Sequence, residues 1–277
     1  MKGNARAVPH IAQAGLRDTL KEQGYFLACI CKPEQDLELC DSDTLISQQC
    51  RVIKREFLNT DVLRICLSVP ENFCFKAGQY ISLVRDDGLA RSYSIASIPQ
   101  HELLELHIRL VPNGAMSLWI KNFLKVDDCV SIKGPFGHCS YHTTNSEKPL
   151  LLMGTGTGLA PLFGILKDAI FQKHVGPIFL FHGGKTPSAL YLSQELRALS
   201  KDKPHFQYYP CVLREGTNDI VAMAMDQYVL KNFPWLKSAR IYLCGDPSFV
   251  TSMRKKLFIA GASSKEIYAD AFLPSIR

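Results

Sequence analysis

A glycine-rich loop, Gly154-Thr-Gly-Thr-Gly158, lies between a fully apolar run and a stretch with the residue pattern of a helix. At such a junction the free backbone N–H groups and the helix dipole favour a bound phosphate group. The loop departs from the G-x-G-x-x-G pattern, because Leu159 occupies the position of the third glycine. Taken alone, the loop is equally typical of a tight turn from a strand to a helix.

The tetrapeptide Arg91-Ser-Tyr-Ser94 is a second candidate for ligand contact. An arginine offers a two-donor fork for a phosphate, and a tyrosine offers a flat apolar face with a polar tip. A serine can hydrogen-bond the edge of a heterocycle. These three chemistries together suit a flavin nucleotide, although the same residues in isolation are also typical of an exposed strand.

Three further segments combine residue types that can contact a nucleotide. Gly114 to Ser117 begin a predicted helix, which is again a natural anion site. Cys244-Gly-Asp-Pro247 ends a predicted strand, where a glycine lets a planar ligand approach the backbone, although Cys244 alone is typical of a core thiol. Phe272 either packs in the core or stacks on a ligand ring.

Two kinds of scaffold are predicted to position these residues. Up to Lys133 the apolar residues alternate with period 2, which predicts short strands. The strands are expected at 51–54, 62–69, 79–84, 92–96, 104–111 and 129–133, with one helix at 116–125. Short strands at this close spacing suggest a six-stranded antiparallel barrel.

From Lys148 onward the pattern changes to strands that alternate with helices. The strands are expected at 149–153, 177–182, 206–212 and 239–244, and the helices at 159–170, 190–199, 223–230 and 247–260. Such alternation implies a parallel sheet covered on both faces, with ligands at the carboxyl ends of its strands. The predicted fold class is therefore β plus α/β: a barrel over residues 45–147 and a Rossmann-like domain over 148–277, joined near 143–147.

Length and composition exclude several other classes of protein. A chain of 277 residues, 47% of them hydrophobic, can bury a sizeable core. No apolar run approaches the roughly 20 residues of a membrane-spanning helix, and the first 23 residues lack the apolar region of a secretory signal, so a cytoplasmic protein with mostly reduced cysteines is expected. The net charge of +6 is scattered, which favours phosphate-bearing ligands or an acidic protein partner over nucleic acid.

In their order and spacing, these motifs resemble the ferredoxin–NADP reductase superfamily, and within it the reductase components of multicomponent oxygenases. The resemblance extends from about Leu45 to the C-terminus. The segments that carry it are Phe75 to Tyr80, Arg91 to Ser97, Gly114 to Ser117, Gly134 to Gly137, Gly154 to Pro161, Cys244 to Pro247 and Asp270 to Phe272. It implies an FAD-dependent NAD(P)H oxidoreductase, in which flavin N5 takes a hydride and the electrons pass to an oxygenase component, a ferredoxin or another acceptor.

The resemblance also implies roles for single residues. Arg91 would contact the FAD phosphates, Tyr93 would pack against the isoalloxazine, and Gly114 to Ser117 would hold the pyrophosphate. Ser94, Cys244 and Phe272 would lie at the reacting rings. The cofactor-binding residues that it implies are Arg91, Ser92, Tyr93, Ser94, His107, Ile108, Arg109, Gly114, Met116, Ser117, Gly154, Thr155, Gly156, Thr157, Gly158, Cys244, Gly245, Asp246 and Phe272.

Residues 23–39 resemble the closing segment of a plant-type ferredoxin domain, in which Cys29 would be the fourth ligand of a 2Fe-2S cluster. The cluster also needs a C-x4-C-x2-C run upstream, and no cysteine precedes Cys29. We therefore expect residues 1–44 to be a ferredoxin-like remnant without a metal, with Cys29 as a lone remnant ligand. Either the gene has decayed or its start has been placed too late.

The sequence leaves the coenzyme and the extent of turnover open. The strand 177–182 is followed by Gly183-Gly-Lys185, with neither the acidic residue expected for NADH nor the arginine that often marks NADPH. NADH is preferred only because the resembled branch generally uses it. The alternative function is a flavin-binding electron-transfer or sensor subunit whose own turnover is lost together with its iron–sulfur relay.

Overall fold

The computed structural model of this chain describes residues 2–3, 26, 31–32, 39–40, 47–142, 145–213 and 220–272. Two units are present, Met1–Gln48 and Gln49–Arg277. In the first unit, β1 (Lys2–Gly3) pairs antiparallel with β2 (Leu39–Cys40). Cys29 and residues 143–144 of the predicted junction lie outside the described residues, so the predictions on them are not examined by the structure.

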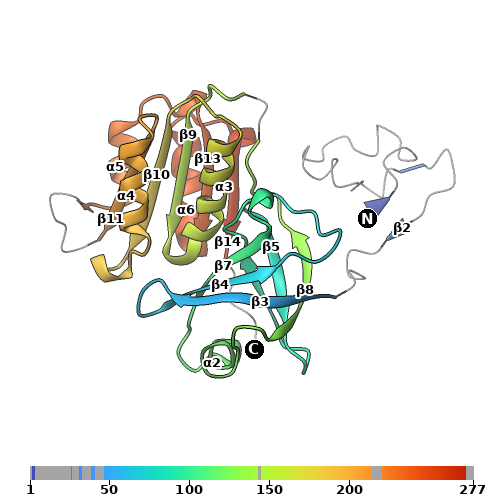
Figure 1. Cartoon of the computed structure of the whole chain (residues 1–277). Coiled ribbons are helices and arrows are strands. Elements are labelled where there is room, and N and C mark those ends of the chain that lie inside the picture. Colours follow the sequence, from blue (N-terminus) through green and yellow to red (C-terminus); the bar gives the residue numbers. More distant parts are fainter. Residues whose placement is uncertain are drawn as a thin grey trace. The chain divides into compact units, whose positions relative to one another are not determined.

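An antiparallel barrel begins the second unit (Figure 1). Its strands are β3 (Gln48–Phe57), β4 (Val62–Ser68), β5 (Tyr80–Val84), β6 (Ala90–Ser94), β7 (Leu103–Arg109) and β8 (Cys129–Phe136). They are ordered β6-β5-β8-β3-β4-β7, and a bridge from Ile95 to Leu106 joins the two ends of this order. The predicted six-stranded barrel is confirmed for residues 47–142, although β3 is longer than the predicted strand at 51–54.

Alternation along the strands fills the barrel with apolar side chains. On β7, for example, Leu104, Leu106 and Ile108 are fully buried and belong to the barrel core. The short helix α2 (Ala115–Asn122) covers this core, because Met116 and Ile120, four residues apart, lie on the same helix face and pack into it.

The rest of the unit is an α/β lobe around a parallel sheet (Figure 1). The strands are β9 (Leu150–Thr155), β10 (Ile178–Gly184), β11 (Phe206–Val212), β12 (Val221–Ala222), β13 (Arg240–Gly245) and β14 (Ile267–Ala271). Among the described residues their order is β12-β11-β10-β9-β13-β14, and every pair is parallel. The predicted parallel sheet is confirmed, and β12 and β14 are strands that sequence reasoning missed.

Helices cover both faces of this sheet. They are α3 (Leu159–Phe171), α4 (Ser193–Asp202), α5 (Met225–Asn232) and α6 (Pro247–Ile259). One apolar cluster joins the sheet to α3 and α4, and another joins it to α5 and α6. No helix in the described part of the chain is long and apolar enough to cross a membrane.

The predicted helix at 190–199 is wrong in its first turn. The backbone of Leu192 is left-handed, with φ of 56°, so the helix cannot extend back through it, and α4 begins at Ser193. Tyr191 therefore precedes the helix, and its side chain is buried. The other helices begin and end within about three residues of their predicted bounds.

Candidate functional site

A cavity of about 500 Å³ is lined by residues from both lobes. From the barrel come Tyr80, Ala90, Arg91, Ser92, Tyr93, Ser94, His107 and Arg109. From the α/β lobe come Thr157, Ala160, Asp270, Ala271 and Phe272. The cavity thus lies where β5, β6 and β7 of the barrel meet the loop before α3 and the end of β14.

Most of the barrel residues that sequence reasoning singled out line this cavity. The tetrapeptide Arg91 to Ser94 forms most of β6, and His107 and Arg109 lie two residues apart on β7. Between them, Ile108 points into the barrel core, because neighbouring side chains of a strand face opposite ways. Ile108 therefore belongs to the predicted segment but does not line the cavity.

Two tyrosines give the cavity flat aromatic surfaces. Burial raises the pKa of Tyr93, which keeps its phenol neutral. Tyr80 ends the segment Phe75 to Tyr80, which carries the family resemblance, but no contact was predicted for it. It pairs with Ser94 across β5 and β6, and its ring centroid lies 5.4 Å from that of Phe136.

Asp270 and Ser94 form a polar pair in the cavity wall. Burial raises the pKa of Asp270 to about 6, although a side-chain hydrogen bond from Ser94 acts to lower it. A carboxyl group with this pKa can hold or release a proton close to neutral pH. Asp270 belongs to a segment that carries the family resemblance, but sequence reasoning gave it no role, because β14 was not recognised as a strand.

The glycine loop and the end of β13 pack directly against each other. A Cβ on Gly158 would lie 2.3 Å from the carbonyl oxygen of Cys244, so a larger residue does not fit there. Gly156 has a left-handed backbone with φ of 54°, and a Cβ on it would meet nothing within 4 Å. The loop is therefore packed on one side and has open space at Gly156, at the N-terminus of α3, where a phosphate would be favoured.

The residues after β13 contact this loop through their backbone. Gly245 has φ of 118°, and the backbone N–H of Asp246 donates to Thr155 Oγ1 at 3.1 Å. The Cys244 side chain is fully buried, and its Sγ lies 3.7 Å from Cys139 Sγ. Cys244 therefore faces the core and not the cavity. The Asp246 carboxylate caps the first turn of α6.

The predicted pyrophosphate segment does not bring side chains to the cavity. Gly114 precedes α2, and Met116 packs into the barrel core. Ser117 Oγ accepts a hydrogen bond of 2.9 Å from the backbone N–H of Val111. The backbone N–H groups in the first turn of α2 are thus what this segment offers a phosphate.

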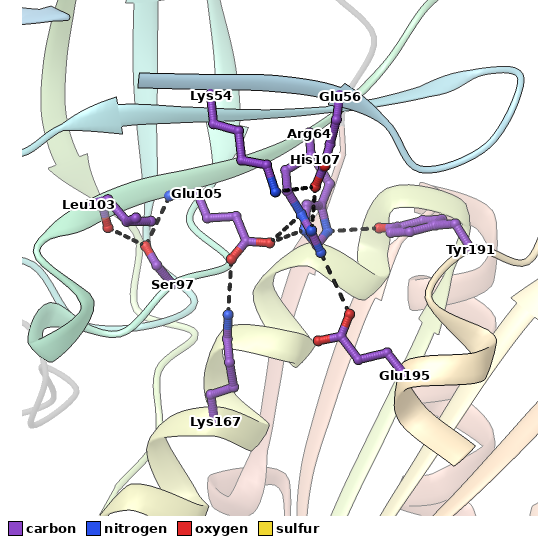
Figure 2. A network of polar contacts seen from close by, with 10 residues as sticks. All are labelled: Lys54, Glu56, Arg64, Ser97, Leu103, Glu105, His107, Lys167, Tyr191 and Glu195. Carbon is purple, nitrogen blue, oxygen red and sulfur yellow. Dashed lines mark hydrogen bonds and ion pairs between the residues drawn. The ribbon is translucent and has the colours of Figure 1, made fainter. Parts of the chain in front are cut away.

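A network of buried charges lies beside the cavity (Figure 2). The Glu105 carboxylate lies 2.9 Å from Arg64 Nε and 3.0 Å from Lys167 Nζ. Burial acts to raise the pKa of Glu105, but the hydrogen bond to His107 and the charges of Lys167 and Arg64 lower it to about 2. Glu105 is therefore ionised at neutral pH.

His107 links this network to the cavity wall. Burial lowers the pKa of His107, which favours the neutral imidazole. The ring then donates from Nε2 to Glu105 Oε1 at 2.9 Å and accepts at Nδ1 from the Tyr191 hydroxyl at 3.2 Å. Sequence reasoning missed Glu105, Lys167 and Tyr191. The alternation of Leu104-Glu-Leu-His-Ile108 was the available signal, since it places Glu105 and His107 on one face.

No group of three or more His, Cys, Asp or Glu side chains suited to a metal ion occurs among the described residues.

Comparison with known proteins places two oxidoreductase families on the two lobes. Residues 49–141 match the oxidoreductase FAD-binding domain, and residues 152–255 match the oxidoreductase NAD-binding domain. A relative from Ralstonia is the ferredoxin–NAD(P)+ reductase component of naphthalene 1,2-dioxygenase and salicylate 5-hydroxylase systems. It is 30% identical over 277 aligned positions, which cover 94% of this chain and 84% of the relative.

Two solved structures extend this comparison. The cytochrome P450 reductase GcoB of Amycolatopsis superposes with a TM-score of 0.78 at 27% identity, over 96% of this chain and 84% of that one. A ferredoxin NADP+ reductase from Neisseria gonorrhoeae, solved with bound FAD and NADP, has a TM-score of 0.72 at 22% identity, over 82% of this chain and 99% of that one. The second likeness bears on the fold alone.

Proposed function

Because this chain belongs to the family of FAD- and NAD-binding ferredoxin–NAD(P)+ reductases, we propose that its cavity holds the FAD ring and receives the nicotinamide. The chain is an FAD-dependent NAD(P)H oxidoreductase. FAD, when bound, supplies the hydride acceptor and the site from which electrons leave one or two at a time. The protein supplies binding, orientation and proton placement.

The residues of the barrel fit the flavin. The cavity of about 500 Å³ has the size of a cofactor site, and Tyr93 and Tyr80 offer aromatic surfaces on which a flat ring system can pack. The Arg91 guanidinium offers a cation for the phosphates, and Arg109 adds a second one in the same wall. The Ser94 hydroxyl can hydrogen-bond the edge of the ring.

The loop before α3 fits the phosphates of NAD(P)H. Its open side at Gly156 combines the backbone N–H groups of a helix N-terminus with room for a ligand. Phe272 lies in the same cavity, and its backbone N–H donates to the Gly245 carbonyl at 2.8 Å. From the family resemblance, we assign Phe272 the role of covering the flavin face that the nicotinamide must reach and of yielding it to the coenzyme.

Asp270 and Ser94 act as the proton-handling pair of this site. With a pKa of about 6, the Asp270 carboxyl takes up or releases a proton close to neutral pH, and the Ser94 side chain that hydrogen-bonds it lines the same cavity. A bound FAD that is reduced to its neutral two-electron form would need one proton besides the hydride, and its reoxidation would return that proton. The pair can hold that proton at a carboxyl oxygen of Asp270.

We assign the electrons to a protein acceptor, either an oxygenase component or a ferredoxin. The Ralstonia relative is named as the reductase component of such systems, which supports this assignment. We also place the protein in the cytoplasm. The described cysteines are free thiols, which fits a reducing compartment.

The single observation behind this function is the cavity that the Arg91 to Ser94 strand shares with Thr157 and Phe272. Arg91→Ala and Tyr93→Ala are expected to weaken FAD binding about 10-fold or more, because each removes a charge or a ring from the cavity wall. Titration of the flavin fluorescence with each variant measures this. The control is Arg254→Ala, which lies on α6 outside the cavity. If Arg91→Ala and Tyr93→Ala both bind FAD as tightly as this control, the assignment is refuted.

A further inference from the structure

One face of α3 packs directly against the barrel. Ala160 lines the cavity, Gly164 packs against the barrel backbone, and Lys167 pairs with Glu105. These positions are four and three residues apart, so they lie on a single helix face. The helix that begins at the glycine loop therefore continues along the barrel as far as Lys167, the third of these positions.

The middle of this contact leaves no space for adjustment. A Cβ on Gly164 would lie 2.9 Å from the carbonyl oxygen of Ile95. On the barrel side, a Cβ on Gly78 would lie 2.9 Å from Ile165 Cδ1. Gly164 is therefore a fixed point of close backbone contact, and we infer that the angle of α3 about this point depends on what holds the far end of the helix.

Lys167 and Glu105 hold that far end (Figure 2). Lys167 Nζ lies 3.0 Å from Glu105 Oε2, and the side chains are only 19% and 9% exposed. Removal of Lys167 would leave Glu105 with Arg64 as its cation, at 2.9 Å, but it would delete the ion pair that ties α3 to the barrel. Another ion pair between the lobes, Arg64 with Glu195 at 3.7 Å, involves a half-exposed glutamate and is correspondingly weaker.

The same carboxylate also reaches the cavity. Glu105 Oε1 accepts from His107, a cavity residue whose ring lies 5.9 Å from that of Phe163 on α3 and 5.3 Å from that of Tyr191. The Tyr191 hydroxyl donates to the other nitrogen of His107. Glu105 thus connects the wall of the proposed flavin site to α3 in two ways. It pairs directly with Lys167, and it hydrogen-bonds His107, whose ring lies near Phe163.

We propose that Glu105 and Lys167 are positioning residues for hydride transfer. This inference rests on the proposed function. Lys167 lies eight residues beyond the start of α3, or about 12 Å along the helix. A tilt at Lys167 therefore displaces the glycine loop and the nicotinamide bound there relative to the flavin ring, and a displacement of about 1 Å can slow a reaction about 100-fold.

The test compares Lys167→Met with Lys148→Met in the FAD-loaded protein. Lys148 forms a similar ion pair, 2.6 Å from Glu266, with the same side-chain exposure of 19%, but both partners belong to the α/β lobe. After rapid mixing with excess coenzyme, flavin bleaching by Lys167→Met is expected to be about 10-fold slower or more at saturation, with the apparent coenzyme affinity within about threefold. Lys148→Met is expected to bleach at the wild-type rate. Lys167→Arg, which keeps the positive charge, is expected to bleach at most of the wild-type rate.

Hydrogen exchange gives a readout that does not depend on turnover. Amides in 159–171 and 103–109 are expected to exchange faster in Lys167→Met and to keep their wild-type rates in Lys148→Met. If Lys167→Met does not fold, Lys167→Gln serves instead, because it also removes the charge that pairs with Glu105 while it keeps a polar side chain, and it is expected to slow bleaching to a similar extent.

The outcomes separate this inference from the proposed function. A wild-type protein whose flavin is bleached by neither coenzyme refutes the function. A wild-type protein that is bleached, together with Lys167→Met or Lys167→Gln at an unchanged saturating rate, refutes the positioning role alone. Equal slowing by Lys148→Met would also refute it, since the effect would then be one of general stability.

Discussion

Asp270 is a cavity residue whose protonation state is expected to change close to neutral pH. It lies on β14 at the cavity, partly buried, and burial outweighs the Ser94 hydrogen bond in raising its pKa to about 6. Glu105, only a few residues from the cavity wall, has its pKa lowered to about 2 by three cationic or donor partners. The two carboxyl groups therefore differ at neutral pH: Glu105 remains charged, whereas Asp270 has a pKa close to neutral, which suits the proton-handling role proposed for it.

Asp270 makes stability fall as the pH rises. Its folded pKa lies above the unfolded value of 3.8, so the folded state binds more protons between these values. The stability that Asp270 contributes is full below about pH 4 and lost as the pH passes about 6. Relative to Asp270→Asn, we expect the wild type to lose about 1 to 3 kcal/mol across this window.

Thermal unfolding of the FAD-saturated protein at several pH values measures this loss. Asp87→Asn is the control, since Asp87 is exposed and hydrogen bonds from Arg85 and the Leu89 backbone lower its pKa to about 2, below the window. If the wild type and Asp270→Asn keep a constant difference in stability from about pH 4 to pH 7, the raised pKa is contradicted.

The glycine loop before α3 shows at the scale of elements how a strand, a turn and a helix form one binding surface. Its glycines have different reasons to be there. Gly158 allows the loop to touch the backbone of β13, whereas Gly156 supplies a left-handed turn with open space beside it. The first is a packing requirement between elements, and the second is a requirement of the backbone alone.

Alanine substitutions distinguish these requirements. Gly158→Ala is expected to lower the free energy of unfolding by about 3 kcal/mol and to weaken coenzyme binding, because its Cβ would overlap the Cys244 carbonyl. Gly156→Ala has room for its Cβ and is expected to cost about 1 to 2 kcal/mol from its φ alone. Urea unfolding compares the two, and a larger loss for Gly156→Ala would contradict the packing argument.

The elements also show what the sequence could predict. The apolar run, the glycine loop and the helix that follows were recognisable because each has a strong local pattern. The strand β14 was missed because Ile267-Tyr-Ala-Asp-Ala271 has neither a long apolar run nor a clear alternation. The start of α4 was misplaced because nothing in the residue type of Leu192 signals a left-handed backbone.

The residues of the candidate site also divide into those that a local pattern predicts and those that it does not. Arg91 to Ser94 were recognisable from a short motif, and the structure places them together in the cavity wall. The pair of Glu105 and Lys167 was not recognisable, because its members are 62 residues apart and meet only when helix α3 packs on the barrel. Long-range pairing of this kind is created by the tertiary structure and leaves no local pattern.

The two lobes depend on each other at the scale of the whole molecule. The barrel contributes Arg91, Tyr93 and Ser94 to the cavity, and the α/β lobe contributes Thr157, Asp270 and Phe272. Neither lobe contains the complete cavity wall, so the reaction requires them to be held together. The interface achieves this with close backbone contacts at Gly164 and with the buried charges around Glu105.

The central claim is that one cavity brings the flavin and the nicotinamide together. An anaerobic visible absorption spectrum of the FAD-loaded, purified chain, recorded before and after addition of NADH and then of NADPH, tests it most directly. We expect the flavin bands to bleach rapidly with one of the two coenzymes, which also identifies that coenzyme. Flavin bands that persist with both coenzymes, or a chain that takes up no FAD, would contradict the claim.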